Sequence, residues 1–342
     1  MTETTTDVVL HLDGLQKYYR TGSSVLSSKK QKPVRAVEQI DLEVRRGECL
    51  GIVGESGSGK STLGRLALRL IEPTAGSVTY EGENISTMSP GRLRRYRAKM
   101  QMIFQDPYSS LNPRMTIGKT LAEAIRFHRV VPREETDEHV ARVLRMVGLP
   151  PEFARRYPRA LSGGQRQRVA IARALAVNPS LVVADEAVSA LDVSIQAEIL
   201  NLMQDIREKQ GLTTLFISHD LSVVELMSDR VLVMYLGRAV EIASAEKIYR
   251  DPRHPYTRAL LSAAPSFQGE PMTLEGEIPS PTDPPSGCVF RTRCPFAVKE
   301  CAEVVPELRE VTPGQFAACI RREVAGETIG ESRPQVRHDA PA

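Results

Sequence analysis

The chain has 342 residues, of which 41% are hydrophobic and 25% are charged, and its formal net charge is +3. This composition is typical of a soluble globular protein, the small charge does not favour a nucleic-acid partner, and the length predicts one large domain with a smaller appendage. Because we find no membrane-spanning apolar run and residues 1–7 do not resemble a secretory signal, we expect a cytosolic protein whose five cysteines form no structural disulfides.

The first elements are short strands over residues 8–53, of which Cys49–Val53 is apolar enough to be buried. A loop that matches G-x-x-x-x-G-K-[ST] follows, formed by Gly54, Glu55, Ser56, Gly57, Ser58, Gly59, Lys60, Ser61 and Thr62. Apolar residues then recur at helical spacing at Leu63, Leu66, Ala67 and Leu70, and we expect this helix to end near Glu72-Pro73.

A strand, a glycine loop and a helix in this order predict a phosphate-binding loop. Glycines let successive backbone N–H groups point at an anion, and the helix directs its positive end to the same place. Lys60 adds a charge for the outer phosphates, and the Ser61 hydroxyl can hold a magnesium ion.

Farther along, strands and helices alternate, which predicts a parallel sheet. Residues 90–157 are expected to be mostly helical, with a loop at 106–113. The later elements are a helix over 165–177, a strand at Leu181–Ala184, a helix that ends at Gly211, a strand at Thr214–Ile217, and a hairpin around Gly237-Arg238.

Four further segments share the order and rough spacing of the motifs of ABC-type ATPases. They resemble the signature motif at Leu161, Ser162, Gly163, Gly164 and Gln165, the Walker B strand at Leu181–Glu186, the D-loop at Ser189–Asp192, and the switch-histidine segment at Ile217–Asp220. The resemblance covers residues 8–250. It implies an α/β P-loop NTPase of ABC type, with a mixed sheet core, an antiparallel β edge and a helical subdomain over about 90–160.

The resemblance also implies ATP and Mg²⁺ as ligands and a role for each motif residue. Lys60, Glu186 and His219 would be catalytic, with Glu186 orienting or deprotonating the attacking water and His219 hydrogen-bonding the γ-phosphate. Ser61, Gln105 and Asp185 would hold magnesium. Each of these residues also has an alternative role without chemistry. Asp185 would be a capping carboxylate, Glu186 a solvated carboxylate, His219 a hydrogen-bonded histidine at a strand end, and Gln105 a surface glutamine.

Two assignments carry an open point of their own. Tyr19 is where an aromatic ring stacks on adenine in this family, but Tyr18 is adjacent, so the register could differ by one, and core packing is a rival role. Glu186 is usually followed by proline, whereas here Ala187 follows it. Because proline restrains the residue before it, alanine could leave Glu186 less rigidly held.

In this family the signature segment faces the phosphate loop of another ATPase domain. Ser162, Gly163, Gly164, Gln165 and Asp192 would therefore complete the site of a second ATPase subunit. Because the sequence contains one copy of each motif, the resemblance implies such a partner, which in related importers is usually a different chain.

A finer resemblance, to oligopeptide/dipeptide importer ATPases, rests on Met102–Pro107, Ser110–Thr116, Arg253–Leu260, Pro279–Pro281 and Gly287–Pro295. It implies a bacterial importer with two membrane permease subunits and an extracytoplasmic binding protein, and a position on the cytoplasmic face of the inner membrane. The domains would be an ATPase at 1–255 and an extension at 256–342 that ends in a flexible tail. Nickel or glutathione as cargo, or a non-transport ABC ATPase, are the alternatives.

Four cysteines gather in the extension at Cys288, Cys294, Cys301 and Cys319. Their spacing leaves an iron–sulfur cluster, zinc and unliganded thiols open, although the tight cysteine pair usual at zinc sites is missing. Related importer ATPases carry such a set around a [4Fe–4S] cluster, so the resemblance favours that interpretation. Cys49, alone on its strand, is expected to be a packing residue.

Overall fold

The structure, a computed structural model, describes residues 8–20, 32–106, 111–189, 191–263, 272 and 274–326. The strands are β1 Val8–Tyr19, β2 Val34–Arg45, β3 Cys49–Val53, β4 Ala75–Tyr80, β5 Glu83–Asn84, β6 Met100–Ile103, β7 Leu181–Asp185, β8 Thr213–Ile217, β9 Arg230–Tyr235, β10 Arg238–Ser244, β11 Arg309–Thr312 and β12 Gln315–Ala317. The helices are α1 Lys60–Ala67, α2 Pro90–Lys99, α4 Ile117–His128, α5 Thr136–Met146, α6 Gly163–Leu175, α7 Val193–Gln210, α8 Leu221–Met227, α9 Ala245–Arg250 and α10 Pro255–Ser262.

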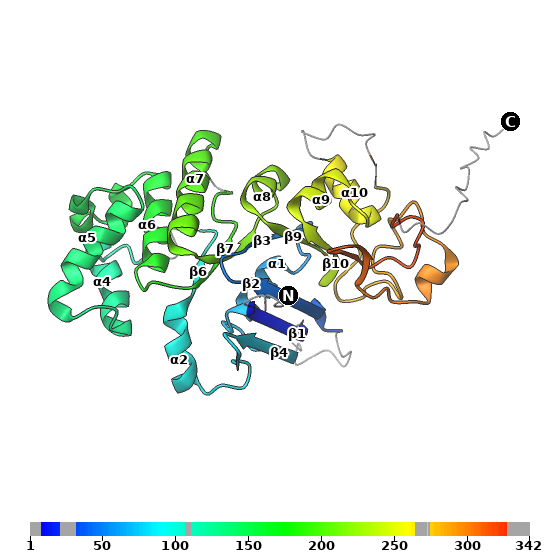
Figure 1. Cartoon of the computed structure of the whole chain (residues 1–342), viewed down its shortest axis with the longest axis horizontal. Helices are drawn as coiled ribbons and strands as arrows, with labels where there is room; N and C mark the ends of the chain where they lie inside the picture. Colours follow the sequence, from blue (N-terminus) through cyan, green and yellow to red (C-terminus); the bar gives the residue numbers. More distant parts are fainter. Residues whose placement is uncertain are drawn as a thin grey trace, which may run out of the picture.

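The centre of the molecule is a mixed sheet. Among the described residues, eight strands form it in the order β11-β12-β10-β9-β3-β8-β7-β6. Figure 1 shows β6, β7, β3, β9 and β10 across the middle of the molecule. The strands from β9 to β6 are parallel to their neighbours, and β10 pairs antiparallel to β9 through the predicted hairpin. Every residue of β3, β7 and β8 is buried, as expected for strands covered on both faces.

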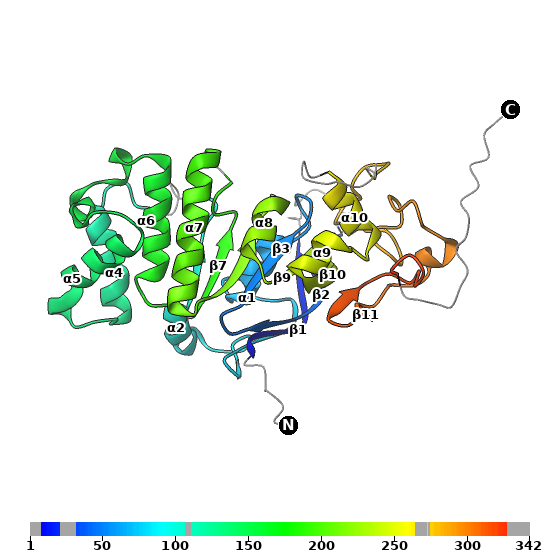
Figure 2. The same ribbon diagram turned by 45° about the horizontal axis from the view of Figure 1, so that its top comes forward.

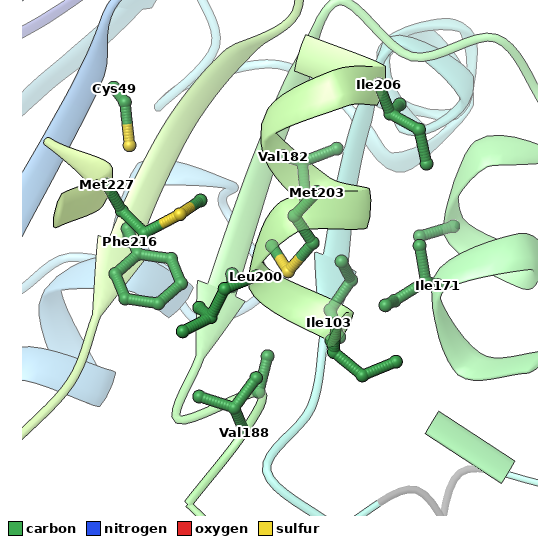
Figure 3. Close-up of a cluster of buried hydrophobic side chains, with 14 of the residues drawn as sticks. Cys49, Ile103, Ile171, Val182, Val188, Leu200, Met203, Ile206, Phe216 and Met227 are labelled. Atoms are coloured by element: carbon green, nitrogen blue, oxygen red, sulfur yellow. The ribbon is translucent and has the colours of Figure 1, made fainter. Parts of the chain in front are cut away.

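One face of this sheet is covered by α7. Its residues Ile199, Met203 and Ile206 recur at helical spacing and are buried, and the helix ends at Gly211, which has a φ of 62°. Figure 3 shows Leu200 and Met203 between the helix and the strands that carry Val182 and Phe216. The predicted helix and its predicted end are confirmed.

The other face packs on α1 and a smaller antiparallel sheet. That sheet has the order β2-β1-β4-β5 within the described residues, and α1 contacts β1, β2, β7 and β8 (Figure 2). Leu63 and Leu66 of α1 are fully buried in this second core. The predicted apolar face is wrong at Leu70, however. The helix ends at Ala67, Arg69 turns left-handed with a φ of 53°, and Leu70 is 41% exposed.

The helices α4, α5 and α6 form one end of the molecule (Figures 1 and 2). The prediction that residues 90–157 are mostly helical is wrong at β6, which pairs in parallel with β7 as the edge strand of the sheet. Met100, Met102 and Ile103 are buried there. The segment forms a strand because the neighbouring β7 supplies backbone hydrogen-bond partners, which the local sequence does not reveal. Residues 107–110 and 190, some of which belong to the motifs that carry the family resemblance, lie outside the described residues.

The C-terminal extension continues the main sheet from the opposite end. β12 pairs with β10 at Glu241–Ala317 and Ile242–Phe316, and β11 pairs with β12. The carboxylate of Glu241 is fully buried and accepts hydrogen bonds from the backbone N–H of Arg253 and His254, each at 2.8 Å, and from the Gln315 side chain at 2.9 Å. The predicted boundary at 255/256 stays a prediction, and the predicted tail, from 327 onward, lies outside the described residues.

None of the helices that the structure describes is both long enough and apolar enough to cross a membrane.

The buried His254 predicts a pH-dependent stability. Burial lowers its pKa to about 3, so at mildly acidic pH the unfolded chain binds a proton at this histidine that the folded chain does not. As the pH is lowered below about 6.5, the free energy of unfolding should therefore decrease, by up to about 1.4 kcal/mol per pH unit from this group. We expect His254→Asn, which keeps an acceptor for the Tyr256 N–H, to flatten this slope in denaturant titrations.

His11→Asn is the matched control, because His11 is an exposed histidine on β1. An identical slope for the wild type and His254→Asn would contradict the prediction.

Candidate functional site

The predicted phosphate loop lies between β3 and α1, and its backbone is closely enclosed. Gly54 and Gly59 have φ values of 148° and 102°, in the range that favours glycine. A Cβ atom would lie 2.2 Å from the Met234 carbonyl oxygen at Gly54, and 2.1 Å from the Ala36 carbonyl oxygen at Gly59. Any side chain at these two positions would therefore displace backbone, so the motif glycines are required by space as well as by conformation.

Lys60 is buried inside the loop, where its ammonium group donates to the carbonyl oxygens of Gly54 at 2.7 Å and Glu55 at 2.9 Å. Burial lowers its pKa, while the nearby carboxylates of Glu186, Asp185 and Glu55 act in the opposite direction. The side chain is thus a positive charge already aimed into an anion-binding loop.

Carboxylates meet this loop at the carboxyl end of β7. Asp185 accepts a hydrogen bond from the Ser61 hydroxyl at 2.7 Å, and Arg65 lies 3.9 Å from its other oxygen. Burial raises the pKa of Asp185, against the effects of the Ser61 hydrogen bond and the Arg65 charge. The paired hydroxyl and carboxylate are oxygen ligands of the kind that Mg²⁺ prefers. The sequence did not point to Arg65 as a neighbour of Asp185.

Glu186 gathers two more predicted residues around its carboxylate. Gln105, just after β6, donates to one oxygen at 2.7 Å, and His219 Nδ1, just after β8, lies 3.5 Å from the other. Glu186 itself has a φ of 49°, a left-handed conformation that is uncommon for glutamate. Ala187, which replaces the usual proline, is buried directly after it. The structure therefore brings together Ser61, Gln105, Asp185, Glu186 and His219.

The two tyrosines at the end of β1 differ clearly in their surroundings. Tyr18 donates its hydroxyl to the carboxylate of Glu38 at 2.7 Å, and burial together with that hydrogen bond raises its pKa to about 12. Tyr19 is 39% exposed, with Lys17 Nζ 5.2 Å from its ring centroid. Tyr19 therefore has an exposed ring that a ligand could stack on, whereas Tyr18 is partly buried and its hydroxyl is hydrogen-bonded to Glu38.

The predicted signature segment lies away from the phosphate loop in the molecule (Figures 1 and 2). Ser162 caps α6 in a capping box with Gln165, and the close packing of Gly164 on Ile195 leaves no room for a side chain. Asp192 precedes α7 and is exposed. Figures 1 and 2 place α6 beside α4 and α5, away from α1 at the centre. The signature helix therefore does not stand over its own phosphate loop.

The four cysteines of the extension line one small cavity of about 20 Å³, together with Phe290 and Phe296. All are free thiols, and burial raises the pKa of both Cys288 and Cys294 to about 11. In the part of the chain that the structure describes, no three or more His, Cys, Asp or Glu side chains are arranged to hold a metal ion. The thiols converge, but their arrangement is not that of a formed ligand set.

Two family models match the chain: ABC transporter over residues 37–189, and the C-terminal region of oligopeptide/dipeptide transporters over residues 240–301. A Brucella ovis protein named as a peptide import ATP-binding protein is 53% identical over 325 residues, which cover 94% of this chain and 99% of that protein. The oligopeptide transport ATP-binding protein AppF of Bacillus subtilis is 49% identical over 326 residues, or 93% and 99% of the two chains.

Among solved structures, the dimeric bacterial ABC transporter cassette MJ0796 superposes with a TM-score of 0.62 at 30% identity, covering 69% of this chain and 98% of that one. A dimeric post-hydrolysis state of the same cassette, bound to ADP and Pi, has a TM-score of 0.61. The predicted fold class is confirmed.

Lys60 provides a direct test of the loop. Replacing it with alanine removes a charge-assisted contact worth about 1.5–3 kcal/mol, so we expect Lys60→Ala to raise the dissociation constant for ATP by about 10- to 150-fold. The measurement is an equilibrium titration with a fluorescent ATP analogue. Lys209→Ala, on the exposed face of α7, should leave the affinity unchanged. Equal affinities for Lys60→Ala and the wild type would refute the assignment.

Proposed function

The chain belongs to the ABC transporter ATPases, in the oligopeptide/dipeptide branch, and from that membership we propose that it is the ATP-hydrolysing subunit of a bacterial peptide importer. The observation that carries the proposal is the convergence of Ser61, Gln105, Asp185, Glu186 and His219 beside a buried Lys60. Relatives about half identical over nearly the whole chain are named for peptide import or oligopeptide transport, which supports this cargo class.

We propose that the phosphate loop binds the triphosphate through its backbone N–H groups and the N-terminus of α1, while Lys60 exchanges its bonds to the Gly54 and Glu55 carbonyls for phosphate oxygens. Tyr19 would stack on the adenine ring. Ser61, Asp185 and Gln105 fit a magnesium ion, which when bound would neutralise charge on the outer phosphates.

Glu186 would orient or deprotonate the attacking water, and His219 would hydrogen-bond the γ-phosphate. Both side chains already stand at the carboxyl ends of neighbouring strands, with Gln105 on the same carboxylate. Because Ala187 places no proline restraint on Glu186, the left-handed conformation at Glu186 is accessible. For hydrolysis, Glu186 would also have to be released from its hydrogen bond with Gln105.

A second ATPase subunit would complete each site. Ser162, Gly163, Gly164, Gln165 and Asp192 would face the phosphate loop of that partner, which we propose is a different chain. The separation of α6 from α1 within this chain and the dimeric state of the MJ0796 cassette support this arrangement. Two permease subunits and an extracytoplasmic binding protein would complete the importer, with this subunit peripheral at the cytoplasmic face of the inner membrane.

An iron–sulfur cluster on Cys288, Cys294, Cys301 and Cys319 is a separate proposal. The shared cavity supports it, because four soft thiol donors from residues 288–319 line one space. The described residues contain no formed ligand set, and the cavity is small. To bind a cluster, the thiols would therefore have to move apart and lose their protons.

The proposed ATPase is tested with Glu186→Gln in the reconstituted transporter. We expect ATP binding to persist, because glutamine keeps the shape of the side chain, whereas hydrolysis and peptide uptake fall at least about 100-fold with the loss of the carboxylate. Nucleotide binding, phosphate release and uptake of a labelled peptide are measured on the same preparation. Glu198→Gln, an exposed carboxylate on α7, is the control. Peptide uptake at the wild-type rate by Glu186→Gln would overturn the proposal.

The cluster is tested by metal analysis of anaerobically purified chain. We expect about four iron ions per chain with a broad visible absorbance, lost in Cys294→Ser and retained in Cys49→Ala, since Cys49 is buried on β3 away from the extension. Stoichiometric zinc would assign a zinc site instead, and a metal-free chain would leave the cysteines as thiols.

A further inference from the structure

The C-terminal extension reaches the phosphate loop directly, at Glu55. The Glu55 N–H donates to the Tyr256 hydroxyl at 2.8 Å. The Glu55 carboxylate accepts from a single nitrogen of Arg293, with distances of 2.8 and 3.1 Å to its two oxygens. Arg293 lies 238 residues farther along the chain, in the segment between Cys288 and Cys301. Nothing in the local sequence at either residue predicts this contact.

Arg293 is held in place by the surrounding backbone and by aromatic rings. Its N–H donates to the Phe290 carbonyl at 3.0 Å, and Phe290 is fully buried against Tyr235 and Tyr256, with ring centroids 5.3 Å away in each case. The Arg293 side chain is 9% exposed and that of Glu55 is 24% exposed. The ion pair is therefore partly shielded from water and fixed by a packed core, unlike a mobile surface pair.

The charge of Glu55 is unfavourable for the function of the loop that contains it. A loop that binds a triphosphate gathers positive charge, yet Glu55 places a carboxylate within it. The Glu55 charge acts on Lys60: together with Glu186 and Asp185 it raises the pKa of the lysine, whereas burial lowers it. An unpaired carboxylate here would repel the phosphates, and the Arg293 guanidinium cancels it at hydrogen-bonding distance.

We propose that Arg293 sets the ATP affinity of the phosphate loop by neutralising Glu55, so that the C-terminal extension contributes an affinity-determining residue to the nucleotide site. This inference rests on the nucleotide binding proposed above and assigns to the extension a role in that binding. Arg293 touches no phosphate in this role, since it acts through Glu55 as a positioning and charge-balancing residue.

The test is a set of titrations of the full chain with a fluorescent ATP analogue. We expect Arg293→Ala to weaken binding by about 3- to 10-fold at low salt, and by less at about 0.5 M salt, because the repulsion from Glu55 is screened. Arg293→Lys, which keeps the charge, should bind nearly as well as the wild type. Above all, Arg293→Ala combined with Glu55→Gln should recover the affinity of Glu55→Gln alone, because the neutral amide no longer needs a cation.

Arg291→Ala is the matched control, because Arg291 lies in the same turn but donates to Ser286 rather than to the loop. It should leave the affinity and the melting temperature unchanged. If the double variant binds as weakly as Arg293→Ala, or if Arg291→Ala weakens binding equally, the arginine acts through folding of the extension and the inference is overturned. Wild-type chain that fails to bind the analogue would instead overturn the proposed function.

Discussion

The parallel direction of β3, β8, β7 and β6 is the constraint on which the site depends. Parallel neighbours end at the same edge of a sheet, so the segments that follow them meet there although they are far apart in sequence. The phosphate loop follows β3, Gln105 follows β6, Glu186 follows β7, and His219 follows β8. Every residue of β3, β7 and β8 is buried because both faces of these strands are covered, and this packing holds the edge in place.

The phosphate loop is held in shape from outside as well as by its own glycines. The backbone of Ala36 on β2 and of Met234 on β9 closes on Gly59 and Gly54, and the Gly237 N–H donates to the Ser58 carbonyl at 2.9 Å. Both sheets therefore contribute to one loop. The extension adds a third support through Tyr256 and Arg293, so the N- and C-terminal parts of the chain both contact the loop.

Local patterns failed where the tertiary structure supplied the deciding partner. The helical spacing of Leu63, Leu66 and Leu70 predicted one apolar face, but the left-handed turn at Arg69 removes Leu70 from it. Residues 100–103 lie within the stretch that was expected to be mostly helical, but they form β6, because β7 offers an edge for parallel pairing. Longer patterns held, as in α7 with its glycine end, because burial of a whole face outweighs single-residue preferences.

The sequence by itself determined the phosphate loop, the order of the ABC motifs, the alternation of strands and helices, and the presence of four cysteines in the extension. These are local properties, since backbone conformation, side-chain charge and hydrophobic period are encoded within a few neighbouring residues. Only the tertiary structure decided which of Tyr18 and Tyr19 is exposed, that Gln105 and His219 share the carboxylate of Glu186, and that Arg293 forms an ion pair with Glu55. Contacts between residues so distant along the chain depend on the packing of the whole fold, which no short pattern contains.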